Sequence, residues 1–162
     1  NQYTDELFAA KKYAYEPCYL NSNRSNPERE FEQFLEEYPN NIAWWWKNGE
    51  NKQNYFGVKY EYPENNIRTF YPDYLVAFKN GKVGIFEVKD RNDRDGKTFT
   101  KAKAESLYLC IKDQKSKGKK ALGGIVIQRD GFWVINQKPS YDWAKCEQNN
   151  WDDWESLLNY MA

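Results

Sequence analysis

The sequence predicts a mixed α/β fold, in which helices flank a β-sheet within a single domain over residues 1–162. Helical and strand-like patterns follow one another in the order helix, strands, helix, two strands, helix. The strand-like segments are rich in aromatic and β-branched residues and are bounded by turn signals. At 162 residues, the chain is close to the usual size of one domain and is long enough to bury one core.

The first strong helical pattern lies in residues 28–37, EREFEQFLEE, whose apolar residues form a stripe at helical spacing. We expect Asn26 to cap this helix, because its side chain can satisfy a free N–H group, and Pro27 to occupy the first position. Pro39 is expected to end the helix. Residues 4–13 are also compatible with a short helix.

Six segments are predicted as strands. They are residues 42–47, 55–62, 67–78, 82–89, 122–128 and 132–136. The last two are expected to pair as a hairpin around Asp130–Gly131. Apolar residues at helical spacing predict a second long helix over residues 98–115 and a short amphipathic helix over residues 151–161.

The composition excludes several classes of enzyme. The chain contains no histidine, which removes every mechanism with imidazole as base, acid or metal ligand. The three cysteines, Cys18, Cys110 and Cys146, are far apart, so neither a zinc ribbon nor a disulfide framework is predicted. This cysteine usage, with no apolar run of membrane-spanning length, predicts a cytoplasmic protein without a membrane partner. Because the single methionine is Met161, we expect a fragment of a longer chain or a processed product.

The most informative segment runs from Asp73 to Lys89. Side chains alternate along a strand, so Glu87 and Lys89, two residues apart, project from one face. A two-residue turn before this strand would place Asp73 on the other face, because directly paired residues share a face. A three-residue loop over residues 79–81, with Gly81 left-handed, instead places Asp73 opposite Glu87. We predict the three-residue loop.

Asp73, Glu87 and Lys89 together predict a site for phosphodiester hydrolysis. Two neighbouring carboxylates repel each other unless a cation lies between them, and oxygen ligands suit Mg²⁺, with Mn²⁺ as a substitute. A lysine beside such an ion can orient or deprotonate a water and offset charge that develops on a phosphate. The alternative interpretation is a solvated Glu87–Lys89 pair beside an unrelated Asp73.

Several segments, taken in order, resemble the PD-(D/E)XK nuclease superfamily, and more closely the endonuclease domain of type III restriction enzymes. They are PEREFEQFLE, IAWWWKNG, YFGVKY, FYPDYLVAF, GKVGIFEVKD, KAESLYLCI and LGGIVI, which span roughly residues 27–127. The resemblance implies a restriction-endonuclease-like mixed sheet flanked by helices, and a metal-dependent DNA endonuclease. The chain departs from the family at Asp90, where a glycine is usual.

The resemblance also implies roles for individual residues. Asp73 and Glu87 would be metal ligands, together with the backbone carbonyl of Val88, and Lys89 would be the catalytic lysine.

A glutamate on the first helix would complete the catalytic set. Glu28 matches the family's E-x-x-F spacing. Glu32 is the alternative, because residues four apart share a helix face, and an ordinary acidic helix surface is the third interpretation.

Basic residues are concentrated after the predicted site, with ten Lys or Arg against four acids in residues 91–120. Lys101 and Lys103 on the predicted helix could contact DNA phosphates, and Lys103 lies in the KAExL segment of the resemblance. A solvated lysine face is the alternative. The 24 basic and 24 acidic residues of the whole chain balance, which predicts weak affinity of the isolated domain for DNA.

The resemblance implies double-stranded DNA as substrate and a methylation or specificity subunit as partner. It also implies a helicase motor in the parent protein, and ATP would act only through that motor. Two alternatives stay open. A structure-specific repair or junction-resolving nuclease is disfavoured by the neutral net charge. A catalytically inert domain that binds DNA or a partner is disfavoured by the presence of all three central residues.

Overall fold

The computed structural model describes residues 5–7, 9–15, 19–21, 23–38, 41–49, 55–63, 66–93, 99–142, 144–145 and 150–162. The fold is mixed α/β, as predicted. Its elements in chain order are β1 (Asp5–Leu7), β2 (Tyr19–Asn21), α1 (Asn26–Glu37), β3 (Ile42–Lys47), β4 (Val58–Tyr62), β5 (Asn66–Phe70), β6 (Tyr74–Phe78), β7 (Val83–Lys89), α3 (Thr100–Ser116), β8 (Ala121–Arg129), β9 (Phe132–Asn136), β10 (Trp154–Ser156) and α5 (Leu157–Met161).

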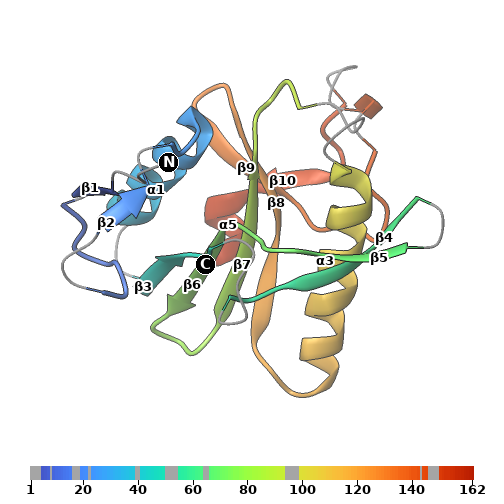
Figure 1. The fold of residues 1–162 in the computed structure, drawn as a ribbon, viewed down its shortest axis with the longest axis horizontal. Coiled ribbons are helices and arrows are strands. Elements are labelled where there is room, and N and C mark those ends of the chain that lie inside the picture. The colour runs from blue at the N-terminus through green and yellow to red at the C-terminus, as the bar shows by residue number, and fades with distance from the viewer. Residues whose placement is uncertain are drawn as a thin grey trace.

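Among the described residues, the main sheet has six strands in the order β10-β9-β8-β7-β6-β3. Strands β7 and β8 are parallel, and the other neighbours are antiparallel. The parallel pair is joined by α3, which runs alongside the sheet in Figure 1. Two small hairpin sheets, β1–β2 and β4–β5, lie outside the main sheet.

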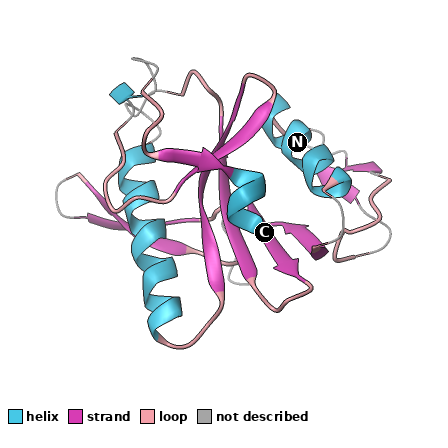
Figure 2. Ribbon diagram, turned by 180° about the vertical axis from the view of Figure 1, so that it is seen from behind, coloured by secondary structure: helices cyan, strands magenta, loops and turns pink. Residues whose placement is uncertain are grey.

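The two faces of the main sheet are covered by different helices. On one face, α1 and α5 pack against β6 and β7 around the fully buried residues Phe31, Phe86 and Leu157. On the other face, α3 packs its buried Leu107 against Ile85 of β7, and the β4–β5 hairpin joins the same cluster. Figure 2 shows α3 well separated from α1, with α5 between them in the view. The first residues of β6 and the last residues of β7, which adjoin at one end of the sheet, therefore lie between two helical layers.

The start of α1 differs by one residue from the prediction. Ser25, and not Asn26, is the N-cap, and Pro27 lies in the first turn. The Glu28 N–H donates to the Ser25 hydroxyl at 3.4 Å, and the Glu28 carboxylate accepts the Ser25 backbone N–H at 2.7 Å. This reciprocal capping box satisfies two N–H groups at once. A cap at Asn26 would put Arg29 at the third position, where no carboxylate could complete the box.

The predicted three-residue loop between β6 and β7 is confirmed. The Phe78 N–H donates to the Lys82 carbonyl at 2.9 Å, and the Gly81 N–H donates to the Phe78 carbonyl at 2.9 Å. Gly81 has φ +79°, a conformation open to glycine at little cost. The register pairs Tyr74 with Phe86, so the residues just before and just after this pair, Asp73 and Glu87, lie opposite each other.

Most predicted elements are present, and besides the N-cap, three predictions about elements are wrong. Residues 67–78 form two strands, because the chain bends at residues 71–73, where Pro72 lacks an N–H for the ladder. Residues 5–7, within the segment expected to be helical, pair as a strand with β2. In residues 151–161, Trp154–Ser156 pairs with β9, and only Leu157–Met161 is helical.

The outer strand β3 is covered by the segment that precedes α1. The Trp45 N–H donates to the Lys12 carbonyl at 2.8 Å, and the Ala14 N–H donates to the Trp45 carbonyl at 2.9 Å. Lys12 Nζ donates to the carbonyls of Leu35 and Glu36, at 3.1 and 2.6 Å, at the C-terminal end of α1. One short segment therefore connects the edge of the sheet to the end of a helix.

Two other predictions concern the cysteines and membrane-spanning helices. Cys110 is a free, partly buried cysteine, while Cys18 and Cys146 lie outside the described residues. In the part of the chain that the structure describes, no helix has the length and apolar character needed to cross a bilayer.

Candidate active site

Asp73 lies in the bend before β6 and is held by hydrogen bonds from β7 and from Asn48, just after β3. Its Oδ2 accepts the backbone N–H of Val88 at 2.8 Å, which ties it to β7. Its backbone carbonyl accepts the N–H of Asn48, just after β3, at 2.8 Å. The Asn48 side chain also donates to the Pro72 carbonyl at 2.9 Å. The carboxylate is thus held between two strands, with Oδ1 directed to other partners.

Glu87 and Lys89 project from one face of β7, as the spacing predicts. Lys89 Nζ lies 2.8 Å from Glu87 Oε1, and their side chains are only 15% and 6% exposed. Burial and the neighbouring Asp73 carboxylate raise the pKa of Glu87 to about 7, although Lys89 opposes the shift. Burial alone lowers the pKa of the Lys89 ammonium, but Glu87 outweighs it, so the net shift is upward and the lysine stays charged.

Lys47 is a site residue that sequence analysis did not single out. Its ammonium contacts Glu28 Oε1 and lies 3.5 Å from Asp73 Oδ1. Burial lowers the pKa of Lys47, but Asp73 and Glu28 outweigh burial and raise it above its ordinary value. The only sequence signal is a lysine at the end of a strand. Its relevance depends on the β3–β6 register, which pairs Lys47 with Tyr74.

The structure gives Glu28 and Glu32 different surroundings. Glu28 is linked to Asp73 through their shared contact with Lys47. Burial raises the pKa of Glu28, but Lys47 outweighs burial and the net pKa is below its ordinary value. Glu32 is fully buried, with Oε2 2.9 Å from Arg24 Nε and Oε1 accepting the Tyr74 hydroxyl at 2.8 Å. Glu28 therefore adjoins the site, whereas Glu32 is held in the core.

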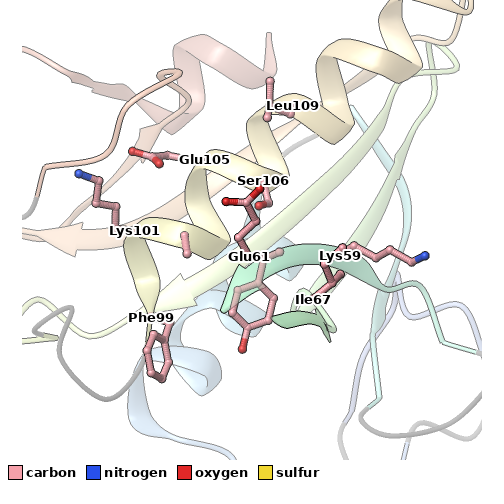
Figure 3. A pocket seen from close by; sticks show the side chains of 10 residues that line it. Lys59, Glu61, Ile67, Phe99, Lys101, Glu105, Ser106 and Leu109 are labelled. Carbon is pink, nitrogen blue, oxygen red and sulfur yellow. The ribbon is translucent and has the colours of Figure 1, made fainter. Parts of the chain in front are cut away.

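The two predicted DNA-binding lysines lie in different places on α3. Lys103 is close enough for its charge to lower the pKa of Glu87, and its ammonium lies 5.8 Å from the centroid of the Phe70 ring. Lys101 is exposed and lines a groove of about 570 Å³ between α3 and the β4–β5 hairpin. Figure 3 shows Lys101 and Glu105 along α3, with Glu61 on the hairpin. Lys103 is thus the one that adjoins the candidate active site.

The donors near Asp73 fit a divalent ion that keeps most of its water ligands. Extending the β6–β7 register by one residue puts Asp73 opposite Glu87, the Asp73 charge acts on Glu87, and the adjacent Val88 N–H is already bonded to Asp73. Within the described ranges, no group of three or more acidic, cysteine or histidine side chains could hold a metal ion. Mg²⁺ is commonly bound by one or two carboxylates plus water. The carboxylate pair fits that ion and would not fit a metal that needs nitrogen or sulfur ligands.

A scan against protein-family models, a search of curated proteins and a search of solved structures each found no match to this chain.

Proposed function

We propose that this chain is a metal-dependent DNA endonuclease domain of restriction-endonuclease-like fold that hydrolyses phosphodiester bonds. The observation that carries the proposal is the juxtaposition of Asp73 and Glu87 at the sheet end, with Lys89 2.8 Å from Glu87. Two carboxylates and a lysine, partly removed from water, can bind a divalent ion and stabilise a reacting phosphate. The mixed sheet flanked by helices supports the same proposal.

In this proposal, each site residue has a distinct role. Mg²⁺, or Mn²⁺ in its place, would polarise a phosphate oxygen and lower the pKa of a bound water. Asp73 and Glu87 would hold the ion, with the Val88 carbonyl as a further ligand. The charged Lys89 ammonium would orient the nucleophilic water and offset negative charge on the phosphate. Glu28 would act on the same centre directly or through water.

The substrate would be double-stranded DNA, whose phosphates Lys103 and Lys101 would contact. The equal numbers of basic and acidic residues fit a module that depends on other parts of an assembly for affinity. We propose that it is the cleavage module of a type III-like restriction enzyme in the cytoplasm. A methylation subunit would choose the sequence, and a helicase motor would use the ATP.

Nicking of supercoiled plasmid at low salt, with Mg²⁺ or Mn²⁺, tests the proposal. The wild type is compared with Lys89→Ala, which keeps both proposed metal ligands, and with Lys112→Ala, which removes an exposed lysine on α3 and serves as a control. We expect metal-dependent nicking that Lys89→Ala lowers at least about a hundredfold and Lys112→Ala leaves unchanged.

Equal cutting by wild type and Lys89→Ala would remove Lys89 from the mechanism. An absence of cutting in every protein would refute stand-alone activity and favour a motor-dependent or inert domain. Preferential cutting of a four-way junction over plasmid would favour a junction-resolving nuclease.

A further inference from the structure

The ammonium of Lys47 lies between two carboxylates of the candidate site. It contacts Glu28 Oε1 and is 3.5 Å from Asp73 Oδ1. It also lies over the Tyr74 ring, 4.6 Å from the ring centroid. The three acidic and basic side chains are each about one-fifth exposed, at 18% for Glu28, 19% for Lys47 and 21% for Asp73. A fixed positive charge thus bridges the helix glutamate and the strand aspartate.

Neighbouring contacts hold Lys47 in this position. The next residue, Asn48, donates its backbone N–H to Asp73 and its side-chain N–H groups to the carbonyls of Phe56 and Pro72, at 2.7 and 2.9 Å. On the other side, Glu28 is fixed by its capping box with Ser25. Because the residue after Lys47 and its partner Glu28 are both held by hydrogen bonds, the structure fixes the position of the ammonium.

The charges of the site favour one divalent ion over two. Asp73, Glu28, Glu32, Asp93 and an ionised Glu87 carry five negative charges, and Lys47, Lys89, Lys103 and Arg24 carry four positive ones. One divalent ion would turn the net charge of −1 into +1, which a phosphodiester group balances. A second divalent ion would raise the net charge to +3 in a partly buried cluster, and excess charge of one sign is costly there.

We propose that the Lys47 ammonium takes the place of a second metal ion, so that the centre binds one divalent ion, on the Asp73–Glu87 side. This inference rests on the proposed metal-dependent function, because it assumes that Asp73 and Glu87 bind an ion. Lys47 is then a positioning residue that neutralises Glu28 and one oxygen of Asp73. Its removal opens a second cation position between these two carboxylates.

The test counts bound Mn²⁺ by electron paramagnetic resonance of the free ion and by calorimetry, in the absence of DNA. The wild type is compared with Lys47→Met, which keeps the length of the side chain without its charge, and with Lys47→Arg, which keeps the charge. We expect one ion in the wild type and in Lys47→Arg, and two in Lys47→Met. Adding Glu28→Gln to Lys47→Met should return the count to one. Thermal unfolding confirms that each variant is folded.

The outcomes separate this inference from the proposed function. Two ions in the wild type, or one ion in a folded Lys47→Met, would overturn the role of Lys47 while leaving the metal centre in place. If the double variant Asp73→Asn, Glu87→Gln bound Mn²⁺ as well as the wild type does, the ion would lie elsewhere. That result would overturn both the role of Lys47 and the proposed function. An absence of Mn²⁺ binding in the wild type would overturn both as well.

Discussion

The backbone N–H of Val88 donates to the carboxylate of Asp73 at 2.8 Å, so the strand that carries Glu87 and Lys89 also positions the acid opposite them. One Asp73 oxygen is used by this bond, and the other lies 3.5 Å from Lys47. The carboxylate therefore combines a structural and an electrostatic role, and the two roles can be separated by substitution.

Asp73→Asn keeps an oxygen for the Val88 N–H but removes the charge. We expect it to weaken Mn²⁺ binding at least about tenfold while stability changes by less than about 1 kcal/mol. Asp73→Ala also leaves the Val88 N–H without its partner, which costs about 1–3 kcal/mol. Calorimetry and urea unfolding measure the two effects, and equal Mn²⁺ affinity in Asp73→Asn and the wild type would contradict the assignment.

Glu87 makes the stability of the metal-free protein depend on pH. Burial and Asp73 raise its pKa from 4.5 to about 7 in the folded state, so the folded state binds more protons than the unfolded state between these values. Stability therefore falls as pH rises from about 4.5 to 7, by on the order of 3 kcal/mol at most. Saturating Mg²⁺, which binds the ionised carboxylate, should remove much of this fall.

Urea unfolding at pH 5 and pH 8, with and without Mg²⁺, measures this dependence. Glu87→Gln is the matched control, because it has the same shape and does not titrate. If the wild type and Glu87→Gln lost the same stability between the two pH values, Glu87 would not be the titrating group.

The buried Arg24–Glu32 pair gives a different prediction for the second helix glutamate. The two side chains are 3% and 0% exposed, with Nε and Oε2 2.9 Å apart. Glu32→Ala leaves the Arg24 charge buried and removes the acceptor of the Tyr74 hydroxyl, which should cost about 3–5 kcal/mol. The double variant Arg24→Met, Glu32→Leu should recover most of this stability, because an apolar pair can replace a buried ion pair.

Mn²⁺ binding by the folded double variant then checks the role of Glu32. We expect the affinity of the wild type, since both carboxylate oxygens of Glu32 are engaged by Arg24 and the Tyr74 hydroxyl. A large loss of affinity at unchanged stability would instead place Glu32 in the metal centre.

Lys103 is expected to contact the phosphate backbone of bound DNA. Lys103→Ala should weaken binding several-fold for every sequence and reduce the slope of log affinity against log salt by about one. Fluorescence anisotropy with a labelled duplex, in Ca²⁺ to suppress cleavage, measures both quantities. Lys112→Ala, on the exposed part of the same helix, is the control, and equal losses in the two variants would indicate a diffuse charge effect.

The central part of the site was predictable because it depends on local geometry. Alternation along one strand places Glu87 and Lys89 on the same face, and the loop with Gly81 fixes which residue lies opposite them. Both depend on a segment of fewer than twenty residues. The fold class was predictable for a similar reason, since the longer helices and strands have clear periodicity.

The contribution of Lys47 could not be predicted in the same way. It depends on the register between β3 and β6, which includes an irregularity between Ile42 and Trp44, and on the reach of a long side chain toward α1. Short elements were also missed. Asp5–Leu7 and Trp154–Ser156 have three residues each and become strands only because a partner strand lies beside them.

The contact of Lys12 and Ala14 with Trp45 has a consequence for self-association. An outer strand with free N–H and C=O groups is a template for strand addition from another molecule, and β3 also presents Trp44, which is 41% exposed. The segment that precedes α1 occupies these groups at Trp45 and is itself fastened to the end of the helix by the Lys12 ammonium. Cleavage of the chain after Ala14 would therefore free the backbone groups of Trp45 and make this sheet edge more prone to aggregation, even with every residue of the candidate active site intact.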